Sequence, residues 1–107
     1  MIRRKKHIIH LIRQKVNEID SNAEVILYGS RARGDNKHDS DWDVMILLKQ
    51  KNVNKKVEQT FRHHLFDLEL EIGVPISVFV YSKSDWEGKY SITPLFRSIK
   101  KEGILIQ

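Results

Sequence analysis

The chain has 107 residues, 40% hydrophobic and 31% charged, a balance that indicates one globular domain over residues 1–107 and excludes a disordered chain. It has no cysteine, which excludes disulfides, thiolate metal sites and cysteine nucleophiles, and its net charge of +5 favours phosphate-bearing partners. Its longest apolar run, Val44 to Leu48, is far shorter than the roughly 20 residues of a membrane span, and no secretory signal is visible, so we expect a cytoplasmic protein without a membrane segment.

The first half of the chain predicts a helix and two strands. Apolar residues three and four apart form one stripe of an amphipathic helix over about residues 3–19, which the polar turn at 20–22 ends. Residues 25–28 are a short buried strand that stops at Gly29-Ser30. The polar stretch 31–40 predicts a turn of helix and a solvent-facing loop, and residues 42–48 are apolar enough for a central strand.

The second half predicts two helices around a third strand. Asn54 can cap a helix that continues to residue 72, although 66–72 also alternate as a strand would; the continuous apolar stripe and Gly73 favour the helix. Residues 75–81 are the third strand, and Thr93-Pro94 opens a last helix that ends at Gly103. Residues 104–106 either pack on the body or pair at a sheet edge. This order predicts an α/β (α+β) fold with a small mixed sheet of three to four strands and helices packed against it.

Two features near the first two strands suggest chemistry. Gly29-Ser30 closes a strand and opens a helical turn, where backbone amides and a hydroxyl could meet a phosphate. Asp41 and Asp43 begin the next strand two residues apart, so both carboxylates face one side and Trp42 the other. Two neighbouring anions repel each other, and a divalent cation such as Mg²⁺ or Mn²⁺ would remove that conflict. Arg31 and Arg33, between the two features, add guanidinium groups that suit phosphate.

The whole combination, LYGSRARGDNKHDSDWDVMILL at residues 27–48, resembles the signature of the minimal nucleotidyltransferase (MNT) family of the DNA polymerase β-like nucleotidyltransferase superfamily. The resemblance implies a nucleotidyltransferase fold and transfer of a nucleoside monophosphate from an NTP to an acceptor hydroxyl. It implies that Asp41 and Asp43 are catalytic and hold the metal ions. It further implies that Gly29, Ser30 and the two arginines, Arg31 and Arg33, bind the nucleotide and its leaving pyrophosphate.

The sequence departs from this family at one position. Polymerase β-like enzymes carry a third carboxylate on a neighbouring strand, where this chain has Ser77, an uncharged side chain that accepts protons poorly. Glu69 or Glu71 could reach the site from the end of the helix, and Asp67 could do so if that segment were a strand. None of the three lies where the family places its carboxylate, so catalytic turnover is in question while nucleotide binding is expected.

Three functions follow from these observations. Members of the MNT family often pair with a HEPN-domain protein as a toxin–antitoxin couple, so the resemblance implies an antitoxin-like enzyme that modifies a partner protein. The missing carboxylate leaves open an impaired nucleotidyltransferase-fold module that masks a HEPN-type partner. The basic clusters at residues 3–15 and 49–56 leave nucleic-acid binding open, although no nucleic-acid motif accompanies them.

Overall fold

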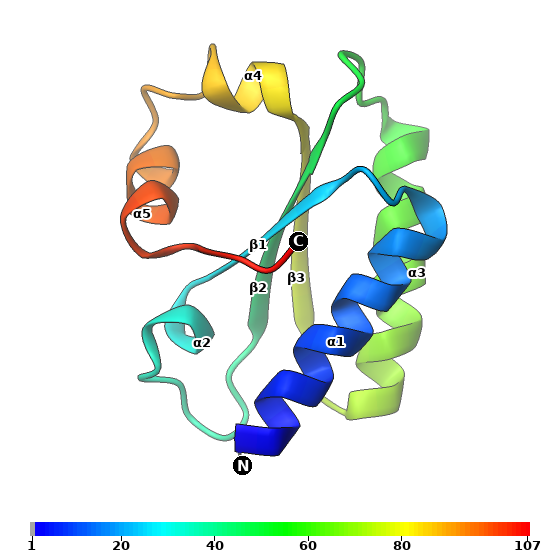
Figure 1. Ribbon diagram of the computed structural model, residues 1–107, viewed down its shortest axis with the longest axis vertical. Coiled ribbons are helices and arrows are strands. Elements are labelled where there is room, and N and C mark those ends of the chain that lie inside the picture. Colours follow the sequence, from blue (N-terminus) through cyan, green and yellow to red (C-terminus); the bar gives the residue numbers. More distant parts are fainter. Residues whose placement is uncertain (1) are drawn as a thin grey trace.

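A computed structural model describes residues 2–107, with side chains from Arg4 onward, so Met1 at the start of the predicted domain lies outside the described residues. The described chain folds into helices on both sides of a small mixed sheet (Figure 1), which confirms the predicted fold class. Its elements are α1 (Ile2–Ile19), β1 (Glu24–Tyr28), α2 (Ser30–Arg33), β2 (Trp42–Leu48), α3 (Lys55–Ile72), β3 (Ile76–Ser82), α4 (Lys83–Glu87), α5 (Pro94–Glu102) and β4 (Ile104–Leu105).

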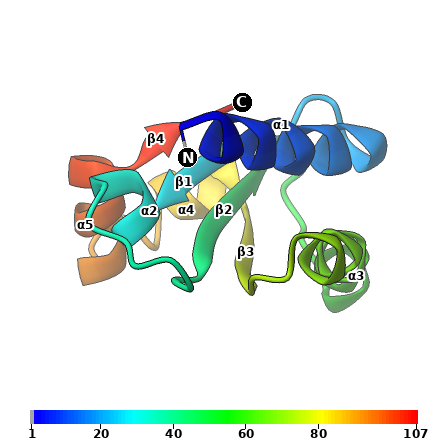
Figure 2. The same ribbon diagram turned by 90° about the horizontal axis from the view of Figure 1, so that it is seen from below.

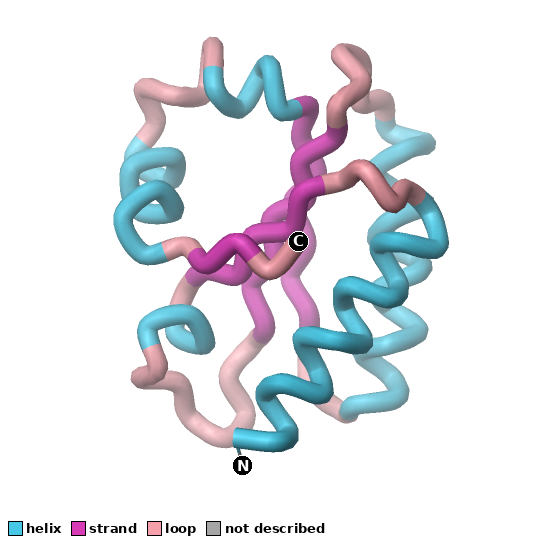
Figure 3. The backbone as a smooth tube through the Cα atoms, in the orientation of Figure 1, coloured by secondary structure: helices cyan, strands magenta, loops and turns pink. Residues whose placement is uncertain are grey.

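The sheet has the strand order β3-β2-β1-β4 over the described residues. The central strand β2 runs antiparallel to β1 and parallel to β3, and the long helix α3 makes the crossover that a parallel pair requires. The short strand β4 pairs antiparallel with β1. The C-terminal end therefore lies beside β1, where Val25 donates its amide to the carbonyl of Gln107 at 3.0 Å (Figure 3).

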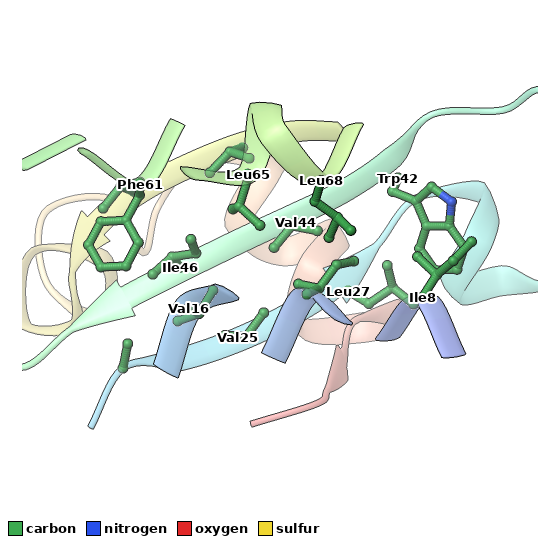
Figure 4. Close-up of a cluster of buried hydrophobic side chains, with 14 of the residues drawn as sticks. Ile8, Val16, Val25, Leu27, Trp42, Val44, Ile46, Phe61, Leu65 and Leu68 are labelled. Atoms are coloured by element: carbon green, nitrogen blue, oxygen red, sulfur yellow. The ribbon is translucent and has the colours of Figure 1, made fainter. Parts of the chain in front are cut away.

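The larger hydrophobic core lies between the sheet and the two long helices, α1 and α3. Trp42 and Val44 of β2 meet Leu27 of β1, Ile8 of α1 and Leu68 of α3 in this core (Figure 4). All five side chains are buried, since none exposes more than 3% of its surface. Burial of alternate β2 residues on this side turns the residues between them, including Asp43, toward the opposite face.

The opposite face of the sheet packs against α4 and α5, which Figure 2 shows on the side away from α3. Met45 and Leu47 of β2 contact a second buried cluster that includes Trp86 of α4 and Ile99 of α5. Tyr81 of β3 stacks on Trp86 with ring centroids 5.6 Å apart. Tyr28 of this cluster pairs with Asp43 across the β1–β2 ladder, and Ser77 pairs with Asp43 on the other side, so both Asp43 and Ser77 lie at the start of their strands next to the cluster.

Most element boundaries agree with the sequence-based expectations. The ambiguous segment 66–72 is helical, because Asn54 caps α3 through its side chain and Gly73 ends it with a left-handed φ of 74°. The last strand pairs at the sheet edge, one of the two expected outcomes. Helix α4 was not predicted, although Ser82 caps it by accepting from the amide of Asp85. No helix in the described part of the chain is long and apolar enough to cross a membrane.

Candidate active site

Gly29 is the corner between β1 and α2, and it lies directly against Asp43. Its φ of 74° and ψ of −158° belong to a region that only glycine occupies readily. A methyl group at Gly29 would lie 3.2 Å from Cγ of Asp43 and would overlap its Oδ2 oxygen. The backbone of the glycine–serine corner therefore reaches the carboxylate because residue 29 has no side chain.

The two carboxylates lie at the start of the central strand. Asp43 pairs with Tyr28 across the β1–β2 ladder, whereas Trp42 is 1% exposed in the core on the other side of the sheet. Asp41 precedes the strand and is exposed. Burial raises the pKa of the Asp43 carboxyl, and the negative charge of Asp41 raises it further. The two acids therefore interact, and Asp43 is the more buried of the pair.

The same carboxylate raises the pKa of the Tyr28 hydroxyl. Burial of that hydroxyl is the larger cause, and the charge of Asp43 is the second. A neutral phenol beside a half-buried carboxylate does not neutralise it. The negative charge on Asp43 is therefore left for a cation or a positively charged side chain to balance.

Ser77 occupies the position on β3 next to Asp43, as the sequence analysis predicted. Its hydroxyl donates to Oδ2 of Asp41 over 3.5 Å, a long contact that joins the serine to the acidic pair. Glu69 does not replace the missing carboxylate there, because its Oε1 accepts the amide of Ile76 at 2.7 Å and so caps the start of β3. Asp67 and Glu71 are exposed on α3.

The two arginines predicted to bind phosphate have different surroundings. Arg33 forms exposed ion pairs with Asp35 at 3.1 Å and Glu102 at 3.2 Å, and its charge lowers the pKa of Asp43. Arg31 instead points toward the loop before β2, where it donates to the carbonyl of Ser40 at 2.7 Å and lies 4.7 Å from the ring centroid of Trp42. The structure therefore brings Arg33 within electrostatic reach of the carboxylates and places Arg31 on the side of Trp42.

The chemistry of these groups fits one hard divalent cation. The described residues contain no group of three or more His, Cys, Asp or Glu side chains that could enclose a metal ion. Mg²⁺ commonly needs only one or two carboxylates, because it retains water and takes its other ligands from substrate phosphates. Asp41 and Asp43, with the Ser77 hydroxyl next to them, suit an ion whose other ligands come from a bound nucleoside triphosphate.

Fold and site together define a nucleotidyltransferase-type domain, and sequence comparison supports the same class. The profile of the nucleotidyltransferase domain matches residues 9–106, so the chain belongs to the nucleotidyltransferase domain family. No curated protein sequence matches the chain.

Two solved structures have the same fold. One is a chain of a toxin–antitoxin crystallised with AMP-PNP, 12% identical, with a TM-score of 0.68 over 92% of this chain and 72% of that one. The other is described as a "putative nucleotidyltransferase from Sulfolobus solfataricus", 23% identical, with a TM-score of 0.62 over 97% of this chain and 83% of that one. At these identities the likeness establishes the fold.

Proposed function

We propose that this domain transfers a nucleoside monophosphate from an NTP to an acceptor hydroxyl in a reaction that depends on Mg²⁺ or Mn²⁺. The observation that carries the proposal is the contact between the Gly29 corner and the Asp43 carboxylate, in a chain of the nucleotidyltransferase domain family. A triphosphate seated on the corner would place its phosphates and their counter-cation beside the acidic pair. In the reaction the acceptor oxygen bonds to the α-phosphorus, and the bond to the departing pyrophosphate breaks.

Each site residue has a distinct role in this proposal. Asp41 and Asp43 would hold the cation, which when bound supplies charge stabilisation for the phosphoryl oxygens. Gly29 offers its backbone at close range and Ser30 its hydroxyl to the phosphates. Arg33 lies within electrostatic reach of Asp43 and suits the charge of the leaving pyrophosphate, a role that the geometry supports less for Arg31.

The surface beside Ser77 supports a protein as the acceptor. A hollow of about 400 Å³ opens between α3 and β3 and includes Ser77 together with Phe66 and Phe79. Phe66 exposes 51% of its surface and Phe79 exposes 39%, so an apolar patch adjoins the acidic pair. One structural neighbour comes from a toxin–antitoxin, and an antitoxin-like role toward a HEPN-domain partner agrees with the resemblance of residues 27–48.

The test is a transfer assay with the purified chain, NTPs radiolabelled at the α-phosphate, Mg²⁺ and the protein encoded by the neighbouring gene. We expect label on the partner, loss of labelling in Asp41→Asn and Asp43→Asn, and normal labelling in Asp67→Asn, which removes a similar charge from an exposed part of α3. Labelling that persists in both site variants, or that is absent with every NTP, contradicts the proposal.

A second function is favoured by Ser77, which stands beside Asp43 where the resemblance calls for a carboxylate. In that case the domain is an impaired nucleotidyltransferase-fold module that binds and masks a HEPN-type partner. The double variant Asp41→Asn, Asp43→Asn would still neutralise the partner if masking is the mechanism. The Ser77→Asp variant separates the two functions further, because a restored carboxylate would raise transfer activity only if turnover is limited at this position.

A further inference from the structure

A second cavity, distinct from the hollow beside Ser77, lies below the start of β2. It has a volume of about 780 Å³, within the range of small-molecule sites. Its walls come from the first turns of α1, from α2 and the loop that follows it, from the first residue of β2 and from the α3–β3 connection. The lining residues are Arg4, Lys5, Ile8, Arg31, Gly34, Asn36, His38, Trp42 and Val74.

The polar part of this cavity is cationic. Arg4, Lys5 and Arg31 line it together with His38 and the amide of Asn36, and no carboxylate is among its lining residues. Burial lowers the pKa of the Arg31 guanidinium, the positive charge of Arg4 lowers it further, and the negative charge of Asp39 raises it. The guanidinium groups of Arg4 and Arg31 therefore repel each other, and a bound anion would relieve that repulsion.

Trp42 provides a second, independent indication of a ligand. Trp42 is 1% exposed and lines the cavity. Among the described side chains, two buried polar atoms have no hydrogen-bond partner, and the Nε1 of Trp42 is one of them. Figure 4 shows this nitrogen turned away from Val44 and Leu27 at the end of the core cluster. An indole nitrogen can only donate, and a buried donor without an acceptor is costly, so an acceptor that reached this nitrogen from the adjoining cavity would be favourable.

We infer that this cavity binds a small phosphate monoester without a metal ion. A monoester carries close to two negative charges and three strong acceptor oxygens, which match the cationic side chains that line the cavity and the unpaired indole donor. The apolar side chains of Ile8 and Val74 suit the non-phosphate part of such a molecule. A single-stranded nucleic acid fits the cavity less well, because the cationic side chains of the cavity line one recess, whereas such a strand binds along an open groove.

The cavity is separate from the proposed nucleotidyl-transfer site. Trp42 and Asp43 are consecutive residues of one strand, so their side chains leave β2 on opposite faces. Arg31 belongs to the cavity side, since it lies over the ring of Trp42. Loss of the carboxylate pair should therefore leave phosphate binding in the cavity unchanged.

The experiment follows the two indole N–H signals of ¹⁵N-labelled protein in EDTA, because the chain has two tryptophans. The Trp86→Phe variant identifies the Trp42 signal. Titration with phenyl phosphate at millimolar concentrations should move the Trp42 indole signal saturably and leave that of Trp86 in place. Inorganic phosphate should compete, and benzoate, with one charge, should bind more weakly by about tenfold or more.

Adjacent residues of α1 provide the matched control. Lys5 lines the cavity, whereas Lys6 is exposed and does not, so Lys5→Gln and Lys6→Gln remove the same charge from neighbouring positions. Lys5→Gln and Arg4→Gln should each weaken phenyl phosphate about tenfold, as loss of a hydrogen bond to a charged group does. Lys6→Gln and Asp43→Asn should bind it like the unaltered chain, so a failure of the proposed transferase activity would not affect this result.

Four outcomes of the phenyl phosphate titration overturn the inference. They are an unmoved Trp42 signal, equal weakening in Lys5→Gln and Lys6→Gln, benzoate binding as tight as that of phenyl phosphate, or loss of binding in Asp43→Asn. An oligonucleotide that binds through Arg4 while phenyl phosphate does not would also overturn it, in favour of a nucleic-acid site.

Discussion

Replacing Gly29 by alanine tests the contact on which the proposed function depends. The backbone conformation at this residue should cost alanine about 1–3 kcal/mol. The added methyl group would also overlap the Asp43 carboxylate, and forcing a group into occupied space costs about another 1–3 kcal/mol. Because Asp43 must move to make room, the variant should lose Mg²⁺-dependent nucleotide binding as well as stability.

Gly73 is the matched control for this substitution. It has the same φ of 74°, but a methyl group there would meet nothing within 4 Å. In the Gly73→Ala variant the free energy of unfolding should therefore fall only by the cost of a left-handed backbone at alanine, about 1–2 kcal/mol, and nucleotide binding should be normal. We expect Gly29→Ala to be less stable than Gly73→Ala by about 2 kcal/mol, a difference of about 8–16 °C in Tm.

Urea unfolding followed by circular dichroism gives the two free energies, and a fluorescent ATP analogue with Mg²⁺ gives the binding. Shortening Asp43 supplies a further check. In an Asp43→Ala background, Gly29→Ala should lower the free energy of unfolding less, because the overlapping carboxylate oxygen is gone. If the Gly29 and Gly73 variants are equally stable and bind nucleotide equally well, the described contact between the corner and the carboxylate is wrong.

Substitutions at three further positions test the scaffold around the site. Phe61→Ala, which empties a 1% exposed position in the main core, should lower the free energy of unfolding by about 3–5 kcal/mol in urea titration. Asn54→Ala should lower the free energy of unfolding by about 1 kcal/mol, because the Asn54 side chain caps α3 by accepting the amide of Val57. Asn54→Asp should retain most of that stability, because aspartate can accept the same amide. Arg31→Met should speed trypsin cleavage at Lys37, because it removes the hydrogen bonds that tie α2 to the carbonyls of His38 and Ser40; an unchanged cleavage rate contradicts that bracing role.

Much of the fold could be predicted because each element carries a local signal. The amphipathic stripes of α1 and α3 and the apolar run of β2 are properties of continuous segments, and they led to the observed strands and long helices. Helix α4 is only five residues long, too short for a periodic stripe, so the Ser82 cap was its one available signal. The pairing of β4 with β1 was left open, because two residues contain no information about their partner.

The candidate site was predictable to the extent that it lies within one segment. Gly29 and Asp43 flank a single connection between two antiparallel neighbours, so their meeting follows from pairing β1 with β2. The position of Arg31 could not be predicted, because its partners are backbone carbonyls whose place depends on the folded loop. The role of Glu69 could not be predicted for the same reason, because its carboxylate accepts the backbone amide of Ile76. Neither arrangement leaves a pattern in the sequence.

The burial of Trp42 also determines where Asp43 points. Moving β2 by one residue against its neighbours would exchange the two faces of the strand, bringing the carboxylate into the core and the indole into solvent. The large apolar area of the indole makes that alternative very unfavourable. The buried tryptophan thus fixes the register that keeps Asp43 out of the core. A chain without it could still pair its strands, but in a register that turns Asp43 toward the core.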